Sequence, residues 1–476
     1  MQGTSTSTTL QAEKLKQSAQ RLFVARKYTE AINFCKRAII VDPQDDVVLE
    51  LLARLYLITE QNRDSCDLFS RLSAKPTCSQ KADVWYGLAM AQSRLENYSD
   101  AIAAFQRAVD LDDLHLNAWN GLGRALHAVG NFPDAEEAIE TALKISPESS
   151  ESWYNMGLIH SDIGDLDRAK KDFEKATKGN PEFAPIWNNL GTVLLRSGDL
   201  RAARVAYEKA LQIKPDYLTP RNGLDELSRK HFMRALEYLK SEENAAAMKE
   251  LDAAIELNPF DCSAFNNRAL ACLRLGKWKR ALADYGETIR LEPAKYRGYL
   301  NRGHVHFLMK NYKKAIEDFS EAYRLEPRAV AALMERGLAF LKLKRSEAAL
   351  ADLNKAIEIQ VDDPVLYFSR GLIYSQMQDW TSCVDDLTHA IKLNPALAVA
   401  YLHRGLAHKY QKNYDAALAD LNKALELGPD DTAAYYVRAW TGFSLKDYRT
   451  AFLDLGQFLG KRGLRAVQDM KKINFV

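Results

Sequence analysis

The stretch NRGHVHFLMKNYKKAIEDFSEAYRLEP, residues 301–327, returns twice further along the chain in closely similar form. Residues 369–395 read SRGLIYSQMQDWTSCVDDLTHAIKLNP, and residues 403–429 read HRGLAHKYQKNYDAALADLNKALELGP. In each copy an Arg near the start is followed sixteen residues later by an Asp, and a Pro closes the line. Self-similarity at a fixed period indicates a repeat architecture, in which each copy buries its apolar face against the next.

When the copies are aligned on the closing Pro, they extend over nearly the whole chain with a period of 34 residues. Each unit contains two helical apolar patterns, which are joined by a short polar turn with Gly, Asn or Asp. The sequence therefore predicts thirteen helix pairs. They begin at Ala12, Asp46, Ala82, Leu116, Ser150, Ala184, Ser228, Cys262, Tyr296, Val330, Pro364, Ala398 and Thr432.

The unit from Ala184 shows why these residue types recur. Gly191 and Ala203 are small, so two antiparallel helices can approach closely, while Trp187 and Tyr207 fill the remaining space. A proline then ends the second helix where the chain must turn. The full pattern of this unit is Trp187, Leu190, Gly191, Leu194, Ala203, Tyr207, Ala210 and Pro215.

This pattern resembles the tetratricopeptide repeat, and the resemblance covers about residues 12–465. It implies an all-α fold, a right-handed superhelical solenoid of antiparallel helix pairs. It also implies that the first helix of each pair lines a concave groove that holds partner peptides.

The spacing of the units suggests two arrays. We expect a disordered tail over residues 1–11, six units over 12–217, an insertion over 218–227, seven units over 228–465 and a capping segment over 466–476. The insertion reads LTPRNGLDEL and contains both Pro and Gly. A hinge is the favoured interpretation of this insertion because ten extra residues offset neighbouring helix pairs, and an extended helix is the alternative.

Composition narrows the function classes. The formal net charge is +2, which gives no general attraction to nucleic acid, and no apolar run reaches the length of a membrane span. The six cysteines form no CxxC pair, and the start of the chain has no apolar stretch typical of a signal peptide. We therefore expect free thiols in the cytoplasm or another reducing intracellular compartment.

Seven later units share an internal rule: an Arg in the first helix is followed sixteen residues later by an acid in the second. Two such positions reach the same level of an antiparallel helix pair. Because every Arg has its own acid, we interpret the pairs as structural, although a row of Arg that binds acidic ligands is the alternative. The pairs are Arg234 and Glu250, Arg268 and Asp284, Arg302 and Asp318, Arg336 and Asp352, Arg370 and Asp386, Arg404 and Asp420, and Arg438 and Asp454.

Catalytic and cofactor signals are missing from the sequence. The nine histidines are spread over distant units, and His304 and His306 lie two apart on a helix, which is unsuitable for a shared metal. The chain has no phosphate-binding glycine loop, HExxH or GxSxG motif. The sequence predicts a chain without enzymatic activity, cofactor or metal.

Two sets of residues are candidates for a peptide-binding groove. Asn155 and Asn189 occupy the same place in adjacent units, as do Asn267 and Asn301, and an amide there can bond to an extended peptide backbone. This resembles part of the asparagine ladder in the repeat arm of the nucleocytoplasmic N-acetylglucosamine transferase. Ordinary helix-surface asparagines are the alternative.

The second set is apolar and lies in the later array. Leaving these apolar side chains exposed to water would cost free energy, so we expect something to cover them. The cover is either the solenoid with its C-terminal segment or an amphipathic helix from a partner, and we favour the partner. Its residues are Phe307, Met334, Leu338, Leu341, Phe368, Leu372, Leu406, Tyr436 and Trp440.

Several later turns between the two helices of a unit are basic. They form a basic rim that we expect to meet an acidic partner or membrane surface, with solvated turns as the alternative. The rim consists of Lys277, Lys279, Arg280, Lys310, Lys313, Lys314, Lys342, Lys344 and Arg345.

Neither array carries the Lys, Asn and Arg set with which related co-chaperones bind the C-terminal carboxylate of heat-shock chaperones. The sequence therefore predicts a protein-binding scaffold or assembly factor that is part of a multiprotein complex and has no chaperone carboxylate clamp. A permanent structural subunit of a large assembly and the targeting or regulatory subunit of a separate enzyme are the alternatives.

Overall fold

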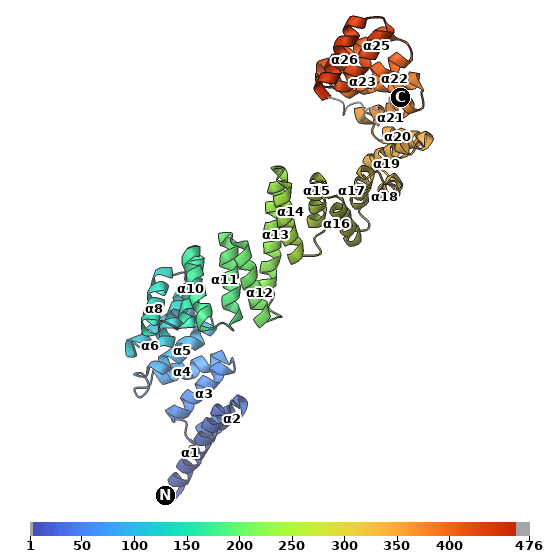
Figure 1. Ribbon diagram of the computed structural model, residues 1–476. Coiled ribbons are helices and arrows are strands. Elements are labelled where there is room, and N and C mark those ends of the chain that lie inside the picture. The colour runs from blue at the N-terminus through green and yellow to red at the C-terminus, as the bar shows by residue number, and fades with distance from the viewer. Residues whose placement is uncertain (1–2, 463–476) are drawn as a thin grey trace. The chain divides into compact units, whose positions relative to one another are not determined.

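The computed structural model describes residues 3–462, which form α-helices joined by short turns and no strand. Figure 1 shows that the helices follow one another in pairs. We call the odd-numbered members first helices and the even-numbered members second helices. None of the described helices has the length and apolar character that crossing a membrane requires.

The chain divides into two compact units, residues 1–227 (unit 1) and 228–476 (unit 2). The helices that begin in unit 1 are α1 Gly3–Val24, α2 Tyr28–Val41, α3 Asp46–Ile58, α4 Asn62–Ser73, α5 Ala82–Arg94, α6 Tyr98–Leu111, α7 Leu116–Ala128, α8 Phe132–Ile145, α9 Ser150–Ile163, α10 Leu166–Gly179, α11 Ala184–Ser197, α12 Leu200–Ile213 and α13 Leu218–Lys240.

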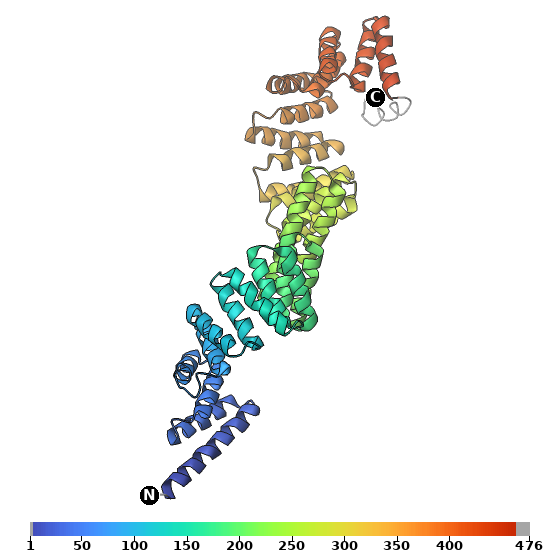
Figure 2. The same ribbon diagram turned by 90° about the vertical axis from the view of Figure 1, so that its left-hand side faces the viewer.

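The helices of unit 2 that follow α13 are α14 Asn244–Leu257, α15 Cys262–Arg274, α16 Trp278–Leu291, α17 Tyr296–Leu308, α18 Tyr312–Leu325, α19 Val330–Lys342, α20 Ser346–Ile359, α21 Pro364–Gln376, α22 Trp380–Leu393, α23 Ala398–Tyr410, α24 Tyr414–Leu427, α25 Thr432–Ser444 and α26 Tyr448–Arg462. Figure 2 shows the same succession of helices from a second direction.

Local chemistry sets the helix boundaries. The first helices begin at the predicted residues from Asp46 to Ala184 and again from Cys262 to Thr432. Aspartate side chains cap several of them: Asp45 accepts hydrogen bonds from the backbone of α3, and Asp261 does the same for α15. Helix starts could therefore be predicted from the period and the caps.

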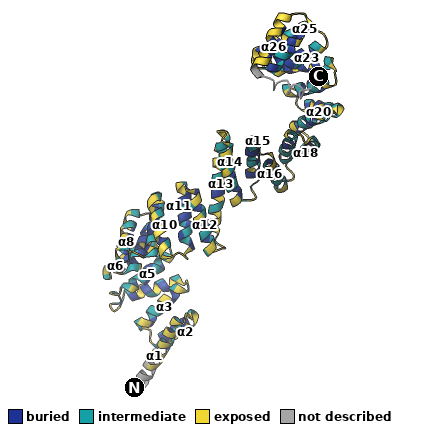
Figure 3. Cartoon of the chain, viewed as in Figure 1, coloured by how far each residue is buried: buried dark blue, intermediate teal, exposed yellow. Residues whose placement is uncertain are grey.

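Close approach of the paired helices depends on glycine. A Cβ atom on Gly191 would lie 2.8 Å from ring carbons of Tyr207, inside any normal contact distance. Tyr207 fills the space that the missing side chain leaves and is 2% exposed. Figure 3 shows buried positions in dark blue within the helix pairs and exposed positions in yellow on the outer surfaces.

The structure corrects our expectation of a disordered tail over residues 1–11. The structure places residues 3–11 in α1, which continues to Val24. Each added residue gains a backbone hydrogen bond from the helix that already follows, which explains an extension beyond the predicted start at Ala12. The capping segment expected over residues 466–476 lies outside the described residues.

The insertion over residues 218–227 is helical and forms the first part of α13. Pro220 of the insertion lies in the first turn, where a helix needs no backbone N–H from it. Gly223 packs on Tyr207 of unit 1, where a Cβ atom would meet a ring carbon at 2.4 Å. The ten residues thus lengthen a first helix, which was the alternative to the favoured hinge.

The two parts of α13 make the contacts that two separate first helices would make. In unit 1, Arg221 donates to the carbonyl of Pro215 at 2.6 Å, and Trp187 makes the matching bond to Pro181 at 2.8 Å. In unit 2, the Ser228 hydroxyl donates to the carbonyl of Ala254 at 2.9 Å. Helix α13 therefore carries two repeat frames, one in each unit.

Candidate functional site

A cleft of about 520 Å³ opens on the face of unit 1 that is formed by the first helices α7, α9 and α11. Its walls carry both charged and aromatic groups. The lining residues are Arg124, Ser150, Glu151, Tyr154, Asn155, Leu158, Asn180, Phe183 and Ile186. We call this cleft the first-helix groove. Of the predicted groove residues, it contains Asn155.

Polar side chains run along this groove in hydrogen-bonded steps from one first helix to the next. Asn155 Nδ2 donates to Asn120 Oδ1 at 3.4 Å, and Asn189 Nδ2 donates to the Tyr154 hydroxyl at 3.1 Å. Asn188 Nδ2 donates to Asn189 Oδ1 at 3.1 Å. These bonds fix the amides in place before any ligand arrives, as a pre-organised peptide-binding surface requires.

Tyr154 lies at the centre of the groove. Its ring packs against Phe173 and, edge-on at 5.8 Å between ring centres, against Phe183. Burial raises the pKa of Tyr154, so its hydroxyl stays protonated at neutral pH and can donate one further hydrogen bond. The Asn188 Oδ1 atom is buried without a hydrogen-bond partner among the described residues.

The two predicted asparagines of unit 2 are arranged differently. Asn301 Nδ2 donates to Asn266 Oδ1 at 3.0 Å, which repeats the step between first helices seen in unit 1. Asn267 Nδ2 instead donates to the carbonyl of Ser263 in its own helix at 2.9 Å. Only Asn301 of this pair therefore takes part in a bond between units of the repeat.

Most of the predicted apolar row in unit 2 packs into the helix array itself. Leu341 and Leu406 are 8% and 7% exposed, so both are core residues, and their prediction as groove residues is wrong. Neighbouring helices lie close enough to cover them. Partly buried against the same or adjacent cores are Phe307, Met334, Leu338, Phe368, Leu372 and Tyr436.

Trp440 is the exposed member of this row, at 46%. Its ring lies 6.1 Å from that of Tyr436 and 5.5 Å from that of Phe443, measured between ring centres. The packing of the solenoid therefore covers most of the surface for which we favoured a partner helix.

Six of the seven Arg and acid pairs are bidentate ion pairs in the structure. In each, Arg Nε and Nη2 donate to the two carboxylate oxygens; for Arg302 and Asp318 the distances are 2.9 and 2.6 Å. The aspartate side chains are 4–8% exposed, so these charges are paired inside the array. The other five pairs are Arg268 with Asp284, Arg336 with Asp352, Arg370 with Asp386, Arg404 with Asp420 and Arg438 with Asp454.

The seventh acid, Glu250, has a histidine as a partner: its Oε2 atom lies 2.6 Å from His231 Nδ1. A histidine also contacts the corresponding acid of one repeat in unit 1, where His160 Nδ1 lies 2.6 Å from Asp172 Oδ2 and His160 Nε2 lies 3.2 Å from Glu136 Oε1. Hydrogen bonding to Asp172 raises the pKa of His160, although burial opposes the charge.

Sequence reasoning missed a third bond made by most of the paired arginines. Arg336 Nη1 donates to Ser320 Oγ at 3.1 Å, which joins the pair to the second helix of the preceding repeat. The acceptor always lies sixteen residues before the Arg, so a search on both sides of each Arg would have found it. The other acceptors are Asp252 for Arg268, Asn354 for Arg370, Thr388 for Arg404 and Asn422 for Arg438.

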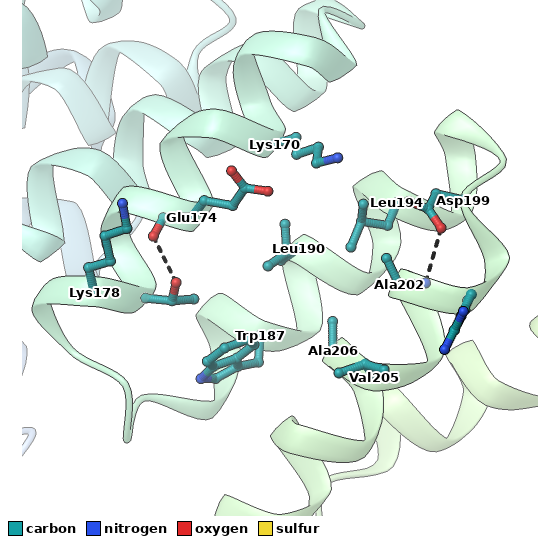
Figure 4. Close-up of a pocket in the computed structure, with 12 residues that line it drawn as sticks. Lys170, Glu174, Lys178, Trp187, Leu190, Leu194, Asp199, Ala202, Val205 and Ala206 are labelled. Atoms are coloured by element: carbon teal, nitrogen blue, oxygen red, sulfur yellow. Dashed lines mark hydrogen bonds between the residues drawn. The ribbon is translucent and has the colours of Figure 1, made fainter.

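In α11 and α12, unit 1 has the apolar residues Leu190 and Ala206 where unit 2 has such a pair, and a cleft of about 610 Å³ lies there between second helices. Trp187, Leu190 and Ala206 face this second-helix cleft, as Figure 4 shows. Along one wall lie Lys170 and Glu174 of α10. The small Ala206 side chain cannot fill the space that an ion pair fills in unit 2.

The basic rim is exposed except at Arg280, which is half-buried and donates to Asp252. Lys310 and Lys344 occupy left-handed turn positions, with φ of 61° and 60°. The remaining members are exposed: Lys277, Lys279, Lys313, Lys314, Lys342 and Arg345. The six cysteines are free, and the described residues contain no cluster of three or more groups that could hold a metal ion.

Family models place the chain among known repeats. A model described as tetratricopeptide repeat matches residues 86–150, 154–217, 232–298, 273–325 and 300–364, which together exceed half of the chain. A second model of the same description matches residues 398–431. No curated protein matches the sequence.

Comparison with solved structures finds several similar chains. The APC/C hetero-tetramer of Cut9 and Hcn1 is 14% identical with a TM-score of 0.41, and the match covers 97% of this chain and 96% of the other. Yeast Tom70 is 16% identical with a TM-score of 0.39 and coverage of 98% and 95%. YrrB, a repeat protein with an unusual peptide-binding site, is 26% identical with a TM-score of 0.33 and coverage of 39% and 95%. With its twenty-six described helices in pairs, the chain belongs to the tetratricopeptide repeat family.

Proposed function

We propose that this protein is a non-enzymatic scaffold or assembly factor that binds an extended peptide from a protein partner in the first-helix groove of unit 1. The observation that carries the proposal is the cleft of about 520 Å³ around Tyr154, with amides already held in place along it. Tetratricopeptide repeats are interaction scaffolds, which supports the choice of a protein partner.

The chemistry of the groove suits a peptide backbone. The Tyr154 hydroxyl can donate a hydrogen bond to a peptide carbonyl, and the Asn155 side-chain oxygen can accept one from a peptide N–H. Leu158 and Phe183 offer apolar contact for a side chain. Arg124 and Glu151 stand at the same cleft with opposite charges, which favours a ligand of mixed charge over a strongly acidic one.

Unit 1 is preferred over unit 2 for this role. The apolar row of unit 2 packs into its own cores, whereas the groove of unit 1 stays open beside hydrogen-bonded amides. Placement in a reducing intracellular compartment belongs to the same proposal, because the described cysteines are free and four of them are buried.

A second candidate is a subunit built permanently into a larger assembly. It is favoured by the second-helix cleft, whose walls include Trp187, Leu190 and Val205, the last being 60% exposed. An exposed apolar cleft on the outer helices is a surface that a permanent neighbour would cover.

One comparison separates the two candidates. Leu158→Glu places a charge in the first-helix groove, and the matched variant Val205→Glu places the same charge in the second-helix cleft. Both full-length variants and the wild type are used for affinity purification with quantitative mass spectrometry, and circular dichroism checks that they fold. We expect Leu158→Glu to lose the specific partner and Val205→Glu to retain it. The opposite pattern favours the permanent subunit, and equal recovery with all three proteins contradicts both candidates.

A further inference from the structure

One step is missing from the series of third bonds made by the paired arginines. The residue sixteen positions before Arg302 is Gly286, which has no side chain to accept a hydrogen bond. Within the described chain, Arg302 Nε and Nη2 bind Asp318, while its Nη1 has no partner. Arg302 is also the most exposed of the six paired arginines, at 30% against 13–20% for the others.

A cleft of about 330 Å³ lies at Arg302, and Leu282 of α16, one turn before Gly286, lines it. A Cβ atom placed on Gly286 would meet no atom within 4 Å, so the space is open up to the backbone of α16. Around it stand Leu282, Arg302, His306, Lys314, Glu317 and Asp318. His306 Nδ1 is buried there without a hydrogen-bond partner among the described residues.

The preceding repeat shows which chemistry fills the same place. There, Asp252 occupies the position that corresponds to Gly286, one period earlier. Its carboxylate accepts a hydrogen bond of 2.8 Å from Arg268 Nη1 and another from Arg280 Nη2. One period later, the counterparts of Arg268 and Arg280 are Arg302 and Lys314.

Lys314 is exposed and makes no ion pair within residues 3–462. Both cations that hold the Asp252 carboxylate one repeat earlier therefore have counterparts here. Position 286, where the corresponding carboxylate would lie, supplies none.

We propose that Arg302 and Lys314 bind the carboxylate of an aspartate or glutamate side chain from a protein partner, in the space above Gly286. The inference rests on the proposed function only in taking the partner to be a protein, and it concerns a different face from the first-helix groove. The partner's side chain takes the place that Asp252 takes in the preceding repeat.

Charge around the cleft supports one acidic group as the occupant. Lys310 and Lys313 of the basic rim are exposed just before Lys314 in the sequence, and their charges attract an acidic segment. Both oxygens of Asp318 are already used by Arg302, so this acid does not compete for the cations' remaining donors. Glu317 lines the cleft as well, and its negative charge disfavours a doubly charged group such as phosphate.

The direct test uses capped glutamate, the amino acid with both backbone ends blocked, as the probe. The full chain, labelled with carbon-13 in its histidines, is titrated while the ring signal of His306 is followed; His306→Gln identifies that signal. We expect a saturable shift in the millimolar range with capped glutamate and none with capped glutamine, which has the same shape without the charge. A response to inorganic phosphate alone, or equal responses to both capped amino acids, overturns the proposal.

Two substitutions at one position provide the matched control. Gly286→Asp supplies the missing acceptor from the chain itself, so it should weaken capped glutamate binding about tenfold or more, which corresponds to about 1.4 kcal/mol. Gly286→Ala adds a methyl group without an acceptor and should bind as the wild type does. If Gly286→Asp still binds like the wild type, the carboxylate is held elsewhere. None of these results depends on Leu158, so failure here and failure of the groove are distinguishable.

Discussion

At the scale of single residues, the buried ion pairs of unit 2 replace an apolar contact of unit 1. Arg336 and Asp352 occupy the places that Leu190 and Ala206 occupy in the earlier array. Arg336 is 15% and Asp352 is 8% exposed, and Ser320 accepts the remaining guanidinium bond. A buried charge whose partner is removed is costly, whereas a complete apolar replacement often costs little.

We therefore expect Asp352→Ala to destabilise unit 2 by about 3 kcal/mol, because Arg336 would be left buried and unpaired. The double variant Arg336→Leu and Asp352→Ala should recover most of this loss, because it places in unit 2 the Leu and Ala that unit 1 has at the corresponding positions. Chemical denaturation of the full chain measures the three free energies of unfolding. Additive losses in the double variant would contradict a structural role of the pair.

The pH dependence of unit 1 should contain a contribution from His160. Asp172, then Glu136, hold its pKa above the ordinary value of 6.5. A histidine with a raised folded pKa stabilises the fold fully below its unfolded pKa and loses this effect as pH rises through the folded value. We expect unit 1 to lose stability as pH rises above about 6.5.

The measurement is a series of denaturation curves between about pH 5.5 and pH 9. In His160→Gln the decline attributable to this side chain should vanish, and Glu136→Gln, which removes only the weaker of the two acceptors, should keep part of it. Parallel curves for wild type and His160→Gln would refute the assignment.

At the scale of elements, α13 is the unusual helix because it carries two repeat frames. Its first part is held in unit 1 by Gly223, which lies against the ring of Tyr207. We expect Gly223→Val to destabilise unit 1 by about 1–3 kcal/mol, because the buried Tyr207 ring cannot move aside without strain.

The control is Gly456→Ala in α26, where a Cβ atom meets nothing within 4 Å. That substitution should stabilise its helix by up to about 1 kcal/mol, since alanine is a better helix former than glycine. Thermal melts of the two variants measure the loss of stability in Gly223→Val and the gain in Gly456→Ala. A neutral Gly223→Val would show that α13 does not depend on this contact.

At the scale of the whole molecule, helices within each unit pack mainly on helices one or two places along the chain. In such arrays stability is a sum of local terms, so a substitution acts on its own repeat and the adjacent ones. We expect hydrogen exchange of Gly223→Val to rise in α11 and α12 and to stay unchanged from α19 to α26. Asp352→Ala should give the converse result, with faster exchange in α19, α20 and the adjacent repeats and no change in α11 and α12. A rise spread evenly over the chain in either variant would show one cooperative unit instead.

The sequence alone determined the helix-pair array and the residues at which most first helices begin. Helices form through bonds between residues four apart, and caps such as Asp45 and Asp261 act on their own first turn, so both signals are local. The Arg and Asp partners could also be predicted, because a fixed period of antiparallel pairs places positions sixteen apart at one level.

Tertiary structure decided the rest, because it depends on contacts between repeats. Packing of adjacent helices buries Leu341 and Leu406 yet leaves Trp440 open, although all three occupy similar positions in an apolar row. The ten inserted residues, for which we favoured a hinge because they offset neighbouring helix pairs, are helical and form the first part of α13. The absence of an acceptor at Gly286 is recognised only from the bonds that the other paired arginines make to the preceding second helix, because those bonds join different repeats.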